Sequence, residues 1–308
     1  MHKALILLNM GGPNNLQEVE VFLKNMFRDE NILPIKSQLL RRFVAFMITS
    51  MRKNEAKKSY EALGGKSPLV MHTQKLVNKL QSRLVDTYVT FTMRYTPPFA
   101  KDTIKELVAR NIKELFLLPL YPHYSTTTTK SSLEDFYNTA KGLGFHARFH
   151  DIANFYENSL FNEAIVQQIV RSVDNTHEYE LIFSAHSLPQ RIIDRGDPYL
   201  QEIQDHVKIL SNLLGSKFSS YHLAFQSKLG PVKWLEPSLE EKLKEMKGKK
   251  VLIYPLSFVL DNSETEFELH IEYKEIAKSL GVQEYKVVPC LNDSDAFVEA
   301  LIDIYKSM

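Results

Sequence analysis

The chain has 308 residues, of which 44% are hydrophobic and 24% are charged, with 38 Lys and Arg against 37 Asp and Glu. This length is enough for one large domain or two smaller ones, and the composition is ordinary for a globular protein with a sizeable core. The balanced net charge does not favour a polyanionic partner, so we expect no nucleic-acid partner.

Cysteine usage and the apolar runs restrict the cellular setting. Cys290 is the only cysteine, which excludes an internal disulfide and a four-cysteine zinc or iron–sulfur site. No stretch approaches the roughly 20 apolar residues of a spanning helix, and the apolar run at 4–8 is too short for a signal peptide. We expect a cytoplasmic protein, with peripheral contact with the inner membrane face left open.

Short runs rich in β-branched and aromatic residues alternate with longer segments of helical period, which is typical of parallel sheets covered by helices. We predict strands at 3–8, 89–94, 114–120 and 147–152, and then at 180–185, 221–226, 250–256 and 284–289. We predict helices at 99–110, 159–173, 199–214 and 264–280. The fold class is therefore α/β.

The two halves of the chain repeat the same order of elements. Four strands in each half predict two similar Rossmann-like domains, each a four-stranded parallel sheet flanked by helices. The expected domains are 1–153 and 154–308, and packing of the last helix back on the first domain is left open.

A long helical insertion at 16–84 precedes the second predicted strand. An apolar stripe runs along part of it, beside several arginines and lysines. The stripe consists of Leu39, Leu40, Phe43, Val44, Met47 and Ile48. We predict that this insertion walls a pocket.

His186 follows the apolar run at 180–185 directly and precedes Pro189 by three residues. Ligands of parallel α/β sheets bind beyond the carboxyl ends of the strands. A histidine inside a strand more often has a structural role, but one at this end faces the crevice. As a neutral imidazole at about pH 7, it can ligate a metal ion or accept a proton.

A series of acidic residues follows a second apolar run. Asp261, Glu264 and Glu268 are spaced by three and four residues, so an α-helix places them on one face. Glu272 and Glu275 continue the series, but they lie farther from the strand end and fit a solvated face better. We expect Asp261 and Glu264 to attract a divalent cation or to carry protons, with Glu268 one turn behind.

Apolar and aromatic side chains also gather where predicted strands end. Such residues usually belong to the core, but this position favours a large, flat, apolar ligand. They are Met10, Tyr95, Tyr121, Trp234 and Phe258. Three polar residues are expected to meet anionic groups on the rim of that ligand: Arg52, Ser67 and Arg94.

Taken together, the motifs at the strand ends resemble those of the ferrochelatase family over nearly the whole chain. The most specific is FSAHSLP at 183–189, followed by GDPY at 196–199. The other matching segments are LNMGGP at 8–13, MRY at 93–95, LYP at 120–122, FQS at 225–227, GP at 230–231, WL at 234–235 and LND at 291–293. Their order and spacing carry the resemblance.

The resemblance implies a lyase-class metal chelatase that inserts Fe²⁺ into a porphyrin, protoporphyrin IX or coproporphyrin III, to form haem and release two protons. Fe²⁺ and porphyrin are then substrates, and no organic cofactor and no iron–sulfur cluster are implied. The resemblance makes His186 and Glu264 the central pair. One would act as metal ligand and the other as proton acceptor, and which residue has which role stays open. Met10 and Tyr95 would line a cleft between the halves, and two further residues would hold propionates: Arg52 and Ser67.

Four positions depart from the family pattern, namely Lys66, His123, Lys130 and Asn262. Two alternative functions stay open: a cobalt chelatase of cobalamin synthesis and a non-catalytic porphyrin or haem carrier. The acidic residues at 261, 264 and 268 speak against a carrier, which has no pyrrole protons to remove. We expect a monomer, and a dimer is left open.

Overall fold

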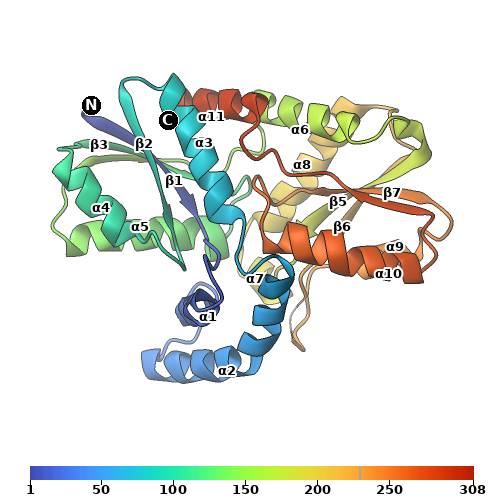
Figure 1. Ribbon diagram of the computed structural model, residues 1–308, viewed down its shortest axis with the longest axis horizontal. Coiled ribbons are helices and arrows are strands. Elements are labelled where there is room, and N and C mark those ends of the chain that lie inside the picture. Colours follow the sequence, from blue (N-terminus) through green and yellow to red (C-terminus); the bar gives the residue numbers. More distant parts are fainter. Residues whose placement is uncertain (229) are drawn as a thin grey trace. The chain divides into compact units, whose positions relative to one another are not determined.

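The computed structural model describes residues 1–228 and 230–308, and the chain forms two compact units. The first unit comprises Met1–Tyr121, Ser125–Asn154 and Ile302–Met308, and the second comprises Pro122–Tyr124 and Phe155–Leu301. Each unit contains one four-stranded parallel sheet with helices against it (Figure 1). The predicted α/β class with two such sheets is confirmed.

The sheet of the first unit has the strand order β2-β1-β3-β4. Its central strand is buried along the whole run from Ala4 to Leu8, as expected for a parallel strand covered on both faces. The strands are β1 (Lys3–Asn9), β2 (Thr87–Met93), β3 (Glu114–Pro119) and β4 (Arg148–Asp151). The helical elements are α1 (Glu18–Arg28), α2 (Gln38–Ala62), α3 (Leu69–Arg83), α4 (Ala100–Ala109), η1 (Thr126–Lys130) and α5 (Ser131–Gly142).

The sheet of the second unit has the equivalent order β6-β5-β7-β8. Its strands are β5 (Tyr179–His186), β6 (Ser220–Gln226), β7 (Lys250–Pro255) and β8 (Glu284–Val287). Its helices before β7 are α6 (Ser159–Arg171), η2 (Thr176–Glu178), α7 (Gln190–Ile193), α8 (Tyr199–Leu214) and α9 (Leu239–Lys244). After β7 come η3 (Glu264–Glu272), α10 (Tyr273–Ser279) and α11 (Asp295–Ser307), whose last residues belong to the first unit.

All eight predicted strands are present, with ends that differ by a few residues. Three of the predicted helices are confirmed by α4, α6 and α8. The helix predicted at 264–280 is not α-helical throughout, because its first nine residues form the π-helix η3. π-helical turns are rare and often occur at functional sites.

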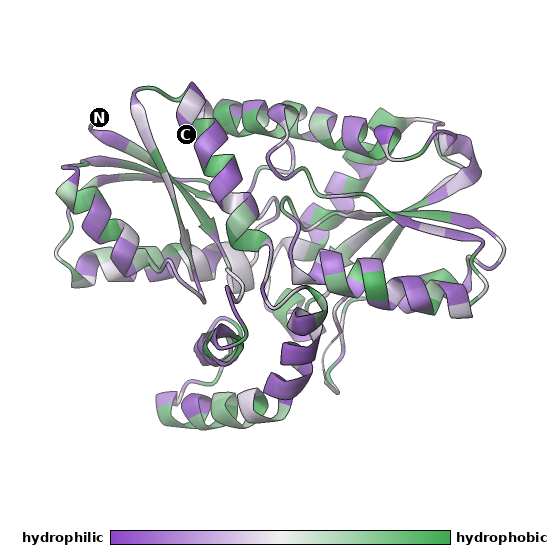
Figure 2. Cartoon of the chain, viewed as in Figure 1, coloured by the Kyte–Doolittle hydropathy of each residue, from purple (hydrophilic) through white to green (hydrophobic). Residues whose placement is uncertain are grey.

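The insertion forms α1, α2 and α3, and the apolar stripe of α2 is divided between two environments. Ile48 of the stripe and the neighbouring Ala45 pack with Val19 and Phe22 of α1. Val44 is half-buried, and the remaining four stripe residues face solvent. Figure 2 shows the hydrophobic first half of α2 and its hydrophilic second half. Within residues 1–228 and 230–308, no helix has the length and apolar character needed to cross a membrane.

Candidate active site

The two residues at the centre of the prediction are in direct contact. His186 is the last residue of β5, and Glu264 is the first residue of η3. The His186 Nδ1 atom lies 2.7 Å from Glu264 Oε2. The two side chains are 36% and 24% exposed, so both can meet a ligand from solvent.

Neighbouring hydrogen bonds fix the position of His186. Its backbone N–H donates to Ser257 Oγ at 3.1 Å, and its carbonyl accepts from Tyr199 Oη at 2.8 Å. The Phe258 ring stands edge-on to the imidazole, with 6.4 Å between ring centroids. Because a carboxylate only accepts, the hydrogen on Nδ1 is directed to Glu264, which leaves the lone pair on Nε2.

Ser227 connects the pair to a second carboxylate. Its Oγ donates to Glu268 Oε2 at 2.5 Å and lies 3.1 Å from Glu264 Oε2, and its backbone N–H donates to Glu268 Oε1 at 2.7 Å. Ser227 directly follows β6 and has a positive φ of 66°, which turns its N–H and hydroxyl toward the same carboxylate. Ser227 was not among the predicted site residues, although its position directly after a strand end was a usable signal.

The three ionisable groups shift one another's pKa. Burial opposes the charged form of His186, but the Glu264 carboxylate outweighs it and raises the pKa of His186. Burial would raise the pKa of Glu264, but the charge and hydrogen bond of His186 and the bond from Ser227 lower it. Burial, together with the charge of Glu264, raises the pKa of Glu268 to about 7. The site therefore contains a carboxyl group that takes up or loses a proton near neutral pH.

Asp261 does not share a helix face with Glu264, because η3 begins only at Glu264. The Asp261 carboxylate accepts hydrogen bonds from Asn292 Nδ2 at 2.6 Å and from the Cys290 N–H at 3.1 Å. That part of the prediction is wrong. Asn262, one of the departures from the family pattern, accepts a hydrogen bond through its Oδ1 from the N–H of Glu264, the first residue of η3, at 2.8 Å.

Trp234 lies beside the segment that follows His186. Trp234 and Pro189 form an isolated antiparallel bridge, and the Leu235 N–H donates to the carbonyl of Leu188 at 3.1 Å. The indole Nε1 is buried and has no hydrogen-bond partner in the part of the chain that the structure describes. Together with Phe258, Trp234 gives the second unit two aromatic side chains close to the segment that bears His186.

In the first unit, the turn after β1 is shaped by close backbone approaches. Gly11 has a φ of +85°, a conformation that favours glycine. A Cβ on Gly12 would lie only 2.5 Å from Ser67 Oγ, so any larger residue would collide there. Ser67 is buried, and its Oγ accepts from the Leu69 N–H at 3.3 Å at the start of α3. The half-buried Met10 lies directly before this turn.

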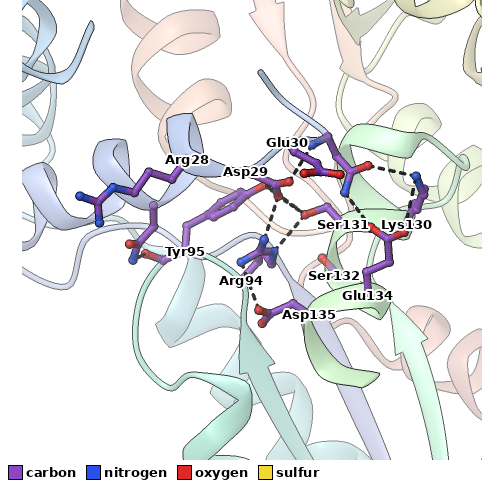
Figure 3. A network of polar contacts seen from close by, with 12 residues as sticks. Arg28, Asp29, Glu30, Arg94, Tyr95, Lys130, Ser131, Ser132, Glu134 and Asp135 are labelled. Carbon is purple, nitrogen blue, oxygen red and sulfur yellow. Dashed lines mark hydrogen bonds and ion pairs between the residues drawn. The ribbon is translucent and has the colours of Figure 1, made fainter. Parts of the chain in front are cut away.

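Arg94 is not free to meet a ligand anion, contrary to the prediction. Its guanidinium donates to Asp29 Oδ2 and to Ser131 Oγ, both at 3.0 Å, and lies 3.3 Å from Asp135 Oδ1 (Figure 3). Burial opposes the charge, but Asp135 and Asp29 more than compensate and raise the pKa of Arg94. The Tyr95 hydroxyl also donates to Asp29, at 2.8 Å.

The remaining predicted residues of the first unit have different surroundings. The Tyr121 hydroxyl is buried and lies 3.1 Å from Ser132 Oγ. Arg52 is half-buried on α2, and this burial lowers its pKa although Glu55 raises it. Lys130, another departure from the family pattern, donates to Asn31 Oδ1 at 3.2 Å.

His123, the departure that follows Tyr121 and Pro122, is buried in the second unit. His123 Nε2 lies 2.8 Å from His206 Nδ1, and His206 Nε2 lies 2.8 Å from Asn162 Oδ1. Burial lowers the pKa of His206 to about 3, and burial with His206 beside it lowers the pKa of His123. Both imidazoles are therefore neutral.

The fold is that of a chelatase. The chain matches the solved structure of SirB from Bacillus subtilis with Fe³⁺ at a TM-score of 0.60 and 10% sequence identity, covering 100% of this chain and 95% of that chain. At this identity the likeness concerns the fold alone.

The chain belongs to the ferrochelatase family, whose model matches residues 2–308. The ferrochelatase of a Nitratiruptor species is 70% identical over 308 residues, covering 99% of this chain and 100% of the relative. That of Sulfurimonas denitrificans is 51% identical over 315 residues, covering 99% of both chains. The family predicted from the motifs is confirmed.

Proposed function

We propose that this protein inserts Fe²⁺ into a porphyrin to form haem, and that His186 and Glu264 act where the metal enters. Membership of the ferrochelatase family supports the reaction. The observation that carries the site is the 2.7 Å contact between His186 Nδ1 and Glu264 Oε2 after two neighbouring strands of one sheet. The enzyme is then a lyase-class metal chelatase, and exchange of two protons for one metal ion needs no organic cofactor.

The proton acceptors follow from the hydrogen bonds. Porphyrin metallation releases two N–H protons, and the site offers two groups to receive them. The His186 Nε2 lone pair can take one proton, with Glu264 stabilising the imidazolium that forms. Ser227 Oγ contacts both Glu264 and Glu268, so a proton can pass through this hydroxyl to Glu268. Glu268 suits this task because its pKa is about 7.

Iron must be held weakly enough to leave for the porphyrin. His186 and Glu264 offer one imidazole nitrogen and one carboxylate. A mixed nitrogen and oxygen site of this kind suits the release of ferrous iron better than a closed thiolate site would. Within residues 1–228 and 230–308, no three His, Cys, Asp or Glu side chains form a metal-binding group. We therefore propose a transit site for iron as a substrate.

For the porphyrin, we propose apolar contacts from Met10, Trp234 and Phe258 and propionate contacts from Arg52 and Ser67. Arg94, Tyr95 and Tyr121 would support the wall from within, since their polar atoms already bond to protein groups. Protoporphyrin IX and coproporphyrin III are both candidates, and anaerobic insertion assays on the two porphyrins side by side decide the preference. A cobalt chelatase or a carrier is not favoured by the family assignment.

The rate of iron insertion should rise as the pH increases through about 7. Below its pKa of about 7, Glu268 is protonated and cannot accept a proton, and the raised pKa of His186 acts in the same direction. In Glu268→Gln, we expect the rise in insertion rate near pH 7 to disappear, so that only the pH dependence due to His186 remains. Initial rates measured from about pH 6 to about pH 8 check this. An unchanged profile in the variant would contradict the relay.

We also propose that monomeric protein touches a membrane surface through α2. Its exposed apolar side chains lie beside basic residues such as Lys36 and Arg42, a combination that suits an anionic lipid interface. The exposed apolar set is Leu39, Leu40, Phe43, Phe46, Met47 and Met51.

Replacing Phe43 and Phe46 together by serine should weaken binding to vesicles of anionic lipid by about tenfold or more, because two large apolar side chains no longer enter the interface. Vesicle co-sedimentation measures the change. The control is Val108→Ser, an exposed apolar residue of α4 outside the insertion. Equal vesicle binding by the wild type and the double variant would exclude α2 as the contact.

A further inference from the structure

A basic hollow of about 530 Å³ lies in the second unit, at the open edge of its sheet. Strand β8 has a strand neighbour on one side only, and its residues line the hollow together with residues from the end of α6, from η3 and from α10. The volume is in the range of small-molecule sites, roughly 300–1,000 Å³. None of His186, Glu264 and Glu268 lines this hollow.

The lining is strongly biased toward positive charge. Its basic residues are Arg171, His270, Lys274 and Lys286, and none of the lining residues that the structure describes is acidic. Lys286 pairs with Glu284 at 2.8 Å. The side chains of Arg171, His270 and Lys274 have no hydrogen-bond or ion-pair partner within residues 1–228 and 230–308. Three basic side chains therefore share one hollow and are not paired with a carboxylate.

This arrangement differs from the usual surface pairing in the same unit. Lys242 pairs with Glu245, and Lys244 pairs with Glu240, each three or four positions away on a helix. His270 reaches the hollow from η3 and Lys274 from α10. Arg171 adds a second positive charge from α6 to that of Lys274, so the hollow favours an anion.

The uncharged part of the lining is already ordered. Tyr285 Oη donates to the Leu269 carbonyl at 3.0 Å, and Gln168 Nε2 donates to the Pro289 carbonyl at 3.3 Å. Ser172 Oγ donates to the Gln168 carbonyl at 2.8 Å. These bonds fix the walls before any ligand arrives, which reduces the entropy lost on binding.

We propose that this hollow binds a small multivalent oxyanion, a molecule with two or more phosphate or carboxylate groups. Arg171 offers the planar donor pair that matches such groups, and Lys274 offers a point charge from the other wall. The His270 imidazole adds a ring N–H donor to the same lining. The proposal is independent of iron insertion, and its test does not use that activity.

The test titrates the metal-free full chain with pyrophosphate and, separately, with citrate by isothermal calorimetry. The variant Arg171→Gln/Lys274→Gln removes two charges from the hollow, and Lys101→Gln/Lys105→Gln removes two exposed charges from α4 as the matched control. We expect the hollow variant to bind at least one of the anions about tenfold or more weakly, and the control to bind like the wild type. Wild-type binding should weaken between about 20 mM and about 200 mM salt.

The NMR resonances of the His270 imidazole provide a local readout, which a change in the overall charge of the protein does not shift. They should shift on addition of the bound anion in the wild type and not in the hollow variant. Binding of pyrophosphate alone would assign a phosphate ligand, and binding of citrate alone a carboxylate ligand. Absence of binding of either anion, equal losses in both double variants, or an unmoved His270 would each overturn the proposal.

Discussion

Replacing His186 by alanine is expected to lower the rate of iron insertion by about 10²–10⁴-fold while the fold stays intact. The variant loses the Nε2 lone pair that faces away from Glu264, and it leaves the Glu264 carboxylate without its imidazole partner. Porphyrin binding should change little, because the proposed apolar and propionate contacts are untouched. Anaerobic stopped-flow absorbance measures the insertion rate, and fluorescence titration measures porphyrin affinity.

A matched control for this change is His222→Ala. His222 on β6 is also partly buried and lies 3.0 Å from a glutamate, Glu180 on β5, in the same sheet. It lies near the start of its strand rather than at the carboxyl end, where ligands bind. We expect His222→Ala to retain wild-type insertion rates. Equal losses in the two variants would mean that the effect of His186→Ala comes from damage to the sheet.

Replacing Asp29 by alanine is expected to lower the free energy of unfolding by about 3 kcal/mol or more, because removing one partner of a buried ion pair leaves the other uncompensated. Asp29 is buried and accepts hydrogen bonds from Arg94 and from the hydroxyls of Tyr95 and Ser131 (Figure 3). The change removes one hydrogen-bond acceptor of the Tyr95 hydroxyl, which keeps only Ser131 Oγ at 3.3 Å, and it leaves Arg94 with Asp135 as its only remaining carboxylate among those in the described chain. Urea denaturation followed by circular dichroism measures the loss.

The neighbouring residue supplies the control for Asp29. Glu30 also pairs with an arginine, Arg41, but its side chain is 69% exposed. Exposed ion pairs contribute about 1 kcal/mol at most, so Glu30→Ala should stay close to the wild type. If Asp29→Ala lowers the free energy of unfolding no more than Glu30→Ala does, the network around Arg94 contributes little to stability.

The architecture was accessible from the sequence because its signals are local. The central strand β1 is an uninterrupted apolar run from Ala4 to Leu8, as burial on both faces requires. The limits of α8, Tyr199–Leu214, agree with the prediction because Gly215 follows it and Pro198 precedes it. His186 could be placed at a strand end for the same reason.

The details of the site depended on contacts between distant residues. Arg94 looked like a ligand for anions, but its partner Asp29 lies 65 residues earlier in the chain, and no local pattern joins the two. The π-helix η3 was read as an α-helix, since both types fit the same apolar spacing over a few turns. Asp261 was grouped with Glu264 on that basis, whereas its carboxylate binds Asn292.

The most direct test is the anaerobic rate of Fe²⁺ insertion by Glu264→Gln, with Glu180→Gln as the control. Glutamine keeps the size of the side chain but cannot stabilise an imidazolium on His186 by charge. We predict that Glu264→Gln binds porphyrin with nearly unchanged affinity and inserts iron far more slowly than the wild type and the control. Near-normal insertion by Glu264→Gln would contradict the assignment of the His186–Glu264 pair as the site of metal entry.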